Sequence, residues 1–274
     1  MTVVDIPPPL PVRDRSDQRE MTSGALSPML RRLAEEEATG VLVREHGTLY
    51  LAQGRVVHAE SPLAPGLGVL LTAHGTLAAT AWQRATERSE SPSDAARLLL
   101  DAGLLPEGAL ELCHLDALYD AGYFALAPSS TPGRFRYDGT PRPGGLPSVP
   151  VVALERETLR RRLLLHRLWP DPAADSAPLI RADPAGAGQV PARRRAVLER
   201  VDGVRTASRI AHDLGRQAFH TLVDVRRLTA DGLLAPVPTA PDPPPAAFRP
   251  PAPLTVTDPD IALLKRLRNA LEAL

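Results

Sequence analysis

The sequence has very little cysteine: Cys113 is the only one in 274 residues. A single thiol cannot form an internal disulfide, and it cannot supply the several thiolates of a structural zinc site. Lysine is almost as rare, since Lys265 is the only one among 32 basic residues. Arginine therefore carries nearly all of the positive charge, and an arginine-rich segment is not in itself a functional signal.

Long apolar runs are also missing. No stretch approaches the roughly 18 apolar residues of a transmembrane helix, and the N-terminus lacks the basic and apolar regions of a signal peptide. The 32 basic and 32 acidic residues give a formal net charge of zero, so the charge of the whole chain favours neither nucleic acid nor membrane. The sequence predicts a cytoplasmic protein with no membrane partner.

Known catalytic patterns are absent from the sequence. There is no GxGxxG fingerprint, Walker A sequence, HExxH or GxSxG. No two of the seven histidines have the i, i+4 spacing of helical zinc ligands. Cys113 and His114 are adjacent, so on a helix they point about 100° apart and cannot act as a nucleophile and its base. We therefore expect no catalytic residues, no metal, no cofactor and no enzymatic activity.

Changes in composition divide the chain into segments. A proline-rich and charged arm is expected to be disordered, two further proline-rich stretches read as linkers, and the remaining segments carry regular patterns. The expected order is an arm at 1–23, a domain at 24–170, a linker at 171–192, a helical module at 193–236, a linker at 237–253 and a helix at 254–274.

Residues 40–61, "GVLVREHGTLYLAQGRVVHAES", predict three antiparallel strands in a meander. Short apolar alternations are separated by "HG" and "QG", which are turn signals. The segment "GRFRYDG" at 133–139 predicts a returning strand, and 27–38 and 152–170 predict helices, with Ser27 as an N-cap. A small sheet with one apolar face needs helices to cover it, so the fold class is expected to be α+β.

This part of the chain resembles a bacterial domain family of unknown function found at the N-terminus of PatA-type response regulators. The similarity spans roughly 24–170 and lies in residues of the meander, with "GRFRYDG" similar to a later strand of the family; the matching positions are Thr39, Gly40, Gly47, Leu49, Leu51, Gly54, Val56 and Ala59. The chain has no receiver domain, so no phospho-acceptor is carried over. The resemblance implies a signalling or regulatory role with a sensor or interaction domain.

Residues 193–236 predict three helices and a final strand. The helices are expected over 193–201, from a cap at Thr206 to Gly215, and from about 216 to 230. The ending "VRRLTADGLL" resembles MarR-like and related winged-helix regulators over about 44 residues. That resemblance implies a winged-helix fold, and many winged helices bind only protein.

The third helix of this module is the candidate recognition helix. On a helical wheel, Ala218, Leu222, Val225 and Leu228 form the core side, and a polar side that includes Asp224 lies opposite. Arginine and glutamine can read base edges, so the first hypothesis is a transcriptional regulator that binds double-stranded DNA. The residues expected to face the major groove are Arg216, Gln217, His220 and Arg227, and those expected to contact phosphates are Arg193, Arg194, Arg205 and Arg226.

Two other interpretations remain open. The chain could be a signalling adaptor in which both domains bind proteins, or a small-molecule sensor built on the meander. The C-terminal helix carries an apolar stripe formed by Ile261, Leu264, Leu267, Leu271 and Leu274. This amphipathic helix is too short to be stable alone, so we expect it to bind a protein partner, a second copy, or its own domain.

Overall fold

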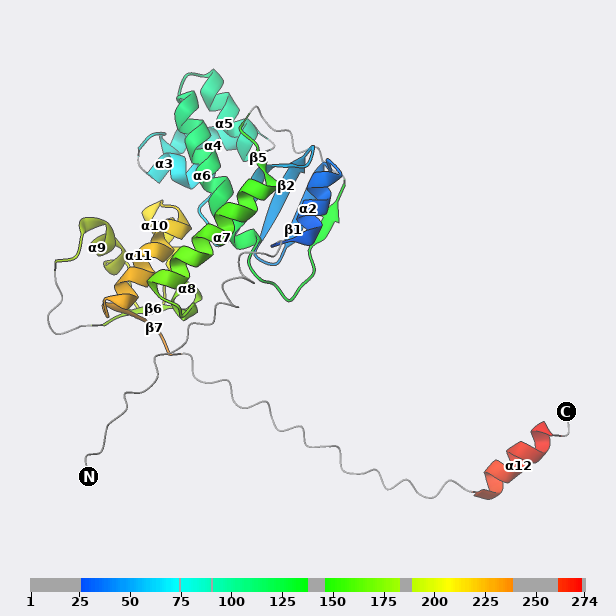
Figure 1. The fold of residues 1–274 in the computed structure, drawn as a ribbon. Helices are drawn as coiled ribbons and strands as arrows, with labels where there is room; N and C mark the ends of the chain where they lie inside the picture. Colours follow the sequence, from blue (N-terminus) through cyan, green and yellow to red (C-terminus); the bar gives the residue numbers. More distant parts are fainter. Residues whose placement is uncertain are drawn as a thin grey trace, which may run out of the picture. The chain divides into compact units, whose positions relative to one another are not determined.

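The computed structural model describes residues 26–73, 75–89, 91–137, 146–182, 189–238 and 261–272 (Figure 1). It divides into one compact unit that ends at Val237 and a second unit from Pro238 onward, each described here by itself. The arm at 1–23 and nearly all of the linker at 237–253 lie outside the described residues. The α+β fold class is confirmed.

The sheet is antiparallel and is built on the expected meander. Strands β1 (Gly40–Arg44), β2 (Gly47–Ala52) and β3 (Arg55–Glu60) are joined by two-residue turns. Strand β4 (Arg134–Arg136) pairs with β1, which confirms the returning strand, and β5 (Val149–Pro150) pairs with β3. The strand order is therefore β4-β1-β2-β3-β5.

The turn between β2 and β3 depends on a glycine. Gln53 and Gly54 both have positive φ, at 49° and 71°, as a type I′ hairpin turn requires. The turn is anchored by two hydrogen bonds, in which the Gly54 N–H donates to the Ala38 carbonyl and the Gln53 N–H to the Thr39 hydroxyl, both at 3.0 Å. A Cβ at Gly54 would lie 2.5 Å from the Ala34 carbonyl oxygen. Any side chain at this corner therefore forces the backbone near Ala34 to shift.

We expect Gly54→Ala to lower the free energy of unfolding by about 2–3 kcal/mol, because it adds a backbone clash to the cost of a positive φ. Gly75→Ala is the matched control, since Gly75 has a φ of 73° and nothing within 4 Å of a Cβ. Gly75→Ala should lower the free energy of unfolding by only about 1 kcal/mol. Urea denaturation of the two variants measures both values, and equal losses would contradict the close approach of the turn to Ala34.

Helices α2 (Pro28–Glu35), α6 (Glu107–Ala125) and α7 (Val151–Leu168) cover one face of the sheet. Ser27 caps α2 as predicted, because its hydroxyl accepts a hydrogen bond from the Leu30 N–H at 3.3 Å. The shared core is apolar and includes Leu30, Leu33, Leu42, Leu49, Leu51, Leu118 and Leu154. Figure 1 shows α2 and α7 beside the strands. The expectation that helices cover the meander is confirmed.

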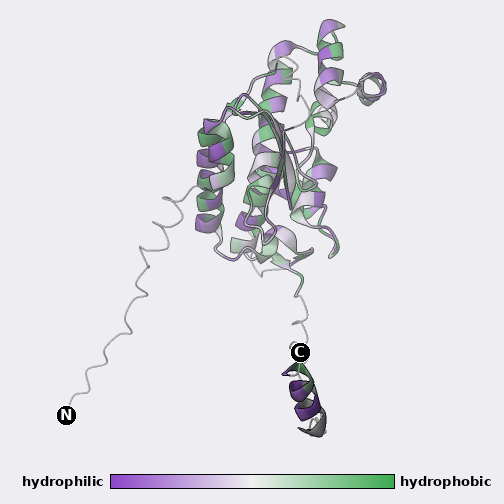
Figure 2. Cartoon of the chain, turned by 90° about the vertical axis from the view of Figure 1, so that its right-hand side faces the viewer, coloured by the Kyte–Doolittle hydropathy of each residue, from purple (hydrophilic) through white to green (hydrophobic). Residues whose placement is uncertain are grey.

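A second helical layer surrounds the first half of α6. It consists of α3 (Leu67–Ala73), α4 (Ala79–Thr86) and α5 (Pro92–Asp101), which enclose their own small apolar core (Figure 1). Figure 2 shows hydrophobic and hydrophilic residues together on the helices of this unit, as expected where each helix buries one side.

The C-terminal part of the first unit consists of α8 (Ala173–Ser176), β6 (Leu179–Arg181), α9 (Ala192–Leu198), α10 (Ala207–Leu214), α11 (Ala218–Ala230) and β7 (Leu234–Pro236). Strands β6 and β7 pair antiparallel. Thr206 caps α10, and Gly215 ends it in the left-handed conformation with a φ of 59°, both as predicted.

Two expected boundaries differ in the structure. The segment 171–192 is not only a linker, because it contains α8 and β6. The three-helix module is not separate from the domain before it either, since Leu165 of α7 belongs to the same apolar core as Ile210, Phe219 and Leu222. The sheet, its covering helices and the three-helix module form one unit.

The second unit contains helix α12 (Ile261–Leu271). Ile261, Leu264 and Leu267 lie within it, Leu271 is 72% exposed, and Leu274 lies outside the described residues. Figure 2 shows α12 mostly in the hydrophilic colour, in agreement with its exposed residues Lys265, Arg266 and Arg268. Among the described residues, no helix combines the length and hydropathy that a bilayer crossing requires.

Candidate functional site

The predicted recognition helix α11 is almost entirely buried. It lies against α7, α8, α9, α10 and β7. Of its thirteen residues, only His220, Arg227 and Ala230 are exposed. Asp224, expected at the centre of an outward face, is 2% exposed, so the helical-wheel prediction is wrong at that position. Asp224 is covered by Arg193, whereas Gln217, His220 and Arg227 of the predicted outward side stay at the surface.

The N-terminus of α11 is held by a carboxylate from α6. Asp120 is fully buried and accepts hydrogen bonds from the Ala218 and Phe219 N–H groups at 2.5 and 2.9 Å. A carboxylate is favourable there, because the first N–H groups of a helix lack partners and carry partial positive charge. Burial raises the pKa of Asp120 to about 6, while the two N–H donors and Arg161 act in the opposite direction.

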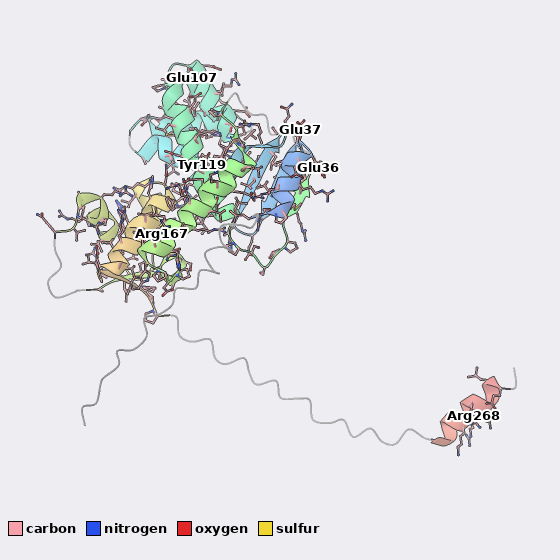
Figure 3. The ribbon with its side chains drawn as sticks, viewed as in Figure 1. Glu36, Glu37, Glu107, Tyr119, Arg167 and Arg268 are labelled. Carbon is pink, nitrogen blue, oxygen red and sulfur yellow. The ribbon has the colours of Figure 1, made fainter. Side chains whose placement is uncertain are left out.

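Arg161 of α7 also takes part in this contact. We call the group formed by Asp120, Arg161, Glu157 and Phe219 the α11 lock. The Arg161 guanidinium lies 3.5 Å from Asp120 and 2.9 Å from Glu157, and its central carbon lies 4.6 Å from the centre of the Phe219 ring. It also donates to the backbone carbonyl of Tyr119 on α6, a residue that is labelled in Figure 3. The lock joins α6, α7 and α11 through buried charge.

The arginines predicted to contact DNA are mostly committed to other groups of the chain. The prediction that Arg226 contacts phosphates is wrong, because its side chain is 5% exposed and bonds both oxygens of Asp175 at 2.6 Å. The others bond as follows: Arg193 with Asp224 at 2.8 Å, Arg194 with Asp231 at 2.6 Å, Arg205 with Asp202 at 2.8 Å and Asp213 at 3.0 Å, and Arg216 with the Arg193 carbonyl at 3.2 Å.

Three predicted residues remain at the start or on the surface of α11. Gln217 is its N-cap residue and is partly exposed, and His220 and Arg227 are exposed. The pKa of His220 is lowered, first by desolvation and then by the charges of Arg193 and Arg161. The eight predicted residues therefore do not form one continuous basic surface.

The side of the sheet that faces away from Leu42, Leu49 and Leu51 is a second candidate site. Strand residues alternate between faces, so Leu42, Leu49 and Leu51 point to the helices and their neighbours point away. The register places Val41 beside Tyr50 and Arg136, and Val43 beside Thr48 and Arg134. We call this surface the open face, formed by Val41, Val43, Thr48, Tyr50, His58, Glu60, Arg134 and Arg136. His58 lies at its border with α6, because its side chain is 17% exposed and its ring stacks on that of His114, with 6.2 Å between the ring centres.

One end of the open face carries a hydrogen-bonded group. The Tyr50 hydroxyl donates to Glu60 at 3.0 Å, and His58 Nε2 lies 3.2 Å from the other carboxylate oxygen. Burial, with the charge of Glu60, raises the pKa of Tyr50 to about 12. The pKa of Glu60 is lowered, mainly by the bond from His58. Tyr50 therefore stays a neutral donor at physiological pH, and Glu60 stays negative.

The remainder of the open face is apolar at its centre and basic at its other end. Val43 is 41% exposed, and Arg134 and Arg136 on β4 are both exposed. Neighbouring strands lie about 5 Å apart, so these side chains form a continuous patch. A surface with an apolar and aromatic centre and opposite charges at its ends is suited to binding another protein.

Comparisons with protein-family models, with curated proteins and with solved structures gave no match. In the part of the chain that the structure describes, no three His, Cys, Asp or Glu side chains are grouped as metal ligands. The open face was not singled out from the sequence. Its signal was the alternation in β1 to β3, in which Val41, Val43 and Tyr50 fall on one face and Leu49 and Leu51 on the other.

Proposed function

We propose that the chain is a non-enzymatic regulatory protein that works as a protein-binding signalling adaptor, with the open face as its partner surface. The observation that carries this proposal is the continuous patch of Val41, Val43 and Tyr50 between Arg134 and Arg136 at one end and Glu60 at the other. Tyrosine and arginine are enriched where proteins bind one another, and apolar side chains at a patch centre supply the desolvation energy.

The three-helix module has a structural part in this proposal. Its third helix is buried and locked to α6 and α7, so the module stabilises the sheet domain and presents surfaces of its own. A rigid unit of this kind gives partner binding a low ordering cost, because little conformational freedom is lost on association.

The experiment is partner capture with two matched variants. Val43→Glu places a charge in the middle of the open face, and Val204→Glu makes the same change at a residue that is 76% exposed elsewhere on the unit. Proteins retained from the native cells by the immobilised wild type should fall at least about tenfold with Val43→Glu, as for a central interface residue. They should be unchanged with Val204→Glu. Equal retention by both variants would contradict this surface.

DNA binding is the second candidate function. Supporting observations are the helix–turn–helix arrangement of α10 and α11 followed by β7, and the basic side chains at the surface of the module, Arg209 at 70% and Arg193 at 51% exposure. Each of these two arginines is also paired with an aspartate, which reduces the charge offered to phosphates.

A further inference from the structure

A pocket of about 340 Å³ opens between the start of α2, the end of β1 and the loop that precedes β4. Arg44 is the one charged side chain among its lining residues. The loop contributes Ser129, Ser130 and Thr131, and apolar walls are provided by Met29 and Leu42. This volume is within the range of small-molecule sites, which combine apolar walls with a few polar groups.

The loop is held close to Arg44 by a glycine. A Cβ at Gly133 would lie 3.3 Å from the Leu42 side chain and 3.5 Å from Cγ of Arg44. The backbone at Gly133 therefore lies against the stem of the arginine. The Thr131 N–H donates to the Ser129 hydroxyl at 3.1 Å, which folds the loop, and Ser130 and Thr131 are exposed.

Arg44 lacks compensation for its charge. Its Nε atom is buried and has no hydrogen-bond acceptor in the part of the chain that the structure describes. No ion pair joins it to a carboxylate within the described ranges. Arg162 of α7 adds a second positive charge nearby and donates to the Leu126 carbonyl. Burial and the charge of Arg44 lower the pKa of Arg162. A buried donor without an acceptor is costly, and a bound anion would satisfy it.

Two carboxylates are hydrogen-bonded to residues that line the pocket, Ser129 and Ser27, and not to Arg44. Glu45 accepts a hydrogen bond from the Ser129 hydroxyl at 2.7 Å. Glu155 is buried and accepts from the Ser27 N–H at 3.1 Å and from the Arg31 guanidinium at 2.6 Å. Neither of them neutralises Arg44.

We propose that this pocket binds a small oxyanion, a carboxylate or a phosphate ester with a short apolar part. The Arg44 guanidinium binds the anionic group, because its planar fork of N–H donors matches two oxygens at once. The hydroxyls of Ser130 and Thr131 donate to the same group, and Met29 and Leu42 contact the apolar part. The site lies on the helix-covered side of the sheet, so this inference does not depend on the function proposed for the open face.

Titration calorimetry of the full chain tests the pocket, with inorganic phosphate and butyrate as separate probes at constant ionic strength maintained with chloride. The wild type should bind at least one probe saturably, and the preferred probe tells whether the ligand is a phosphate or a carboxylate. Arg44→Gln should weaken that binding by about tenfold or more, the usual effect of losing a charged hydrogen bond. Arg209→Gln, an exposed arginine on α10, should bind like the wild type.

The double variant Ser130→Ala with Thr131→Val keeps the test decisive if Arg44→Gln does not fold. Both residues are exposed, so the fold should be retained while the affinity falls several-fold. Lack of saturable binding of either probe up to about 50 mM would overturn the proposal. Binding that is the same in the wild type and in the Arg44 or loop variants would also overturn it, because the anion would then lie elsewhere.

Discussion

Asp120→Ala is expected to lower the free energy of unfolding by about 3 kcal/mol or more. The substitution leaves the Ala218 and Phe219 N–H groups buried without acceptors and removes one carboxylate from the side of Arg161. It also removes a helix cap, which costs about 1 kcal/mol by itself. Urea denaturation monitored by circular dichroism measures the loss.

Asp116→Ala is the matched control on the same helix. Asp116 lies one turn earlier and is partly exposed, and its charge raises the pKa of Asp120. Removing it should change the stability by about 0.5 kcal/mol or less. If Asp120→Ala were as mild as this control, Asp120 would not be holding α11 in place.

Asp120 should also produce a defined pH dependence. Its pKa in the folded chain is about 6, above the value of an ordinary aspartate, so the folded chain binds the proton more tightly than the unfolded chain. The contribution of this group to stability therefore decreases as the pH rises through about 4 to 6. When the pH is lowered from about 7 to about 5, the free energy of unfolding of the wild type should rise by about 1 kcal/mol relative to that of Asp120→Asn. A constant difference would contradict the raised pKa.

Arg226→Ala is expected to lower the free energy of unfolding by about 2–3 kcal/mol, because it leaves both oxygens of Asp175 and the Trp169 carbonyl without their donor. The neighbouring Arg227→Ala should cost about 0.5 kcal/mol or less, because Arg227 is exposed. Thermal unfolding separates the two variants: only Arg226→Ala should show a melting temperature several degrees lower. Similar small losses would contradict the burial of Arg226 against α8.

Local signals in the sequence were sufficient for the strands of the meander and for the helix caps, but not for β5 and β6. Glycines in the turns and the alternation of apolar and polar residues located β1, β2 and β3. The Ser27 and Thr206 caps could be predicted from the residues next to them in the sequence. The burial of α11 could not be predicted in this way. The N–H groups at the start of α11 donate to Asp120, and Asp120 lies 98 residues before Ala218 in the chain. Arg226 and Arg227 are adjacent and chemically identical, but Arg226 bonds Asp175 and the Trp169 carbonyl, 51 and 57 residues away in the chain.

The candidate sites were predictable only in part. The alternation in β1 and β2 defined two faces of the meander, but the sequence did not tell which face the helices would cover. The basic end of the open face comes from β4, far along the chain, so only the register of β1 with β4 brings Arg134 beside Val43. Similarly, the environment of Arg44 depends on α2 and the 129–133 loop, which no local pattern connects to β1.

We propose that α11 is a structural helix of a protein-binding adaptor and does not read DNA. Fluorescence anisotropy of the full chain with mixed double-stranded DNA fragments, at about 50 mM and about 200 mM salt, tests it most directly. We predict no saturable binding at either salt concentration. Tight binding that falls steeply with salt, and that Arg216→Ala with Arg227→Ala abolishes, would contradict the claim and establish the module as a DNA-binding domain.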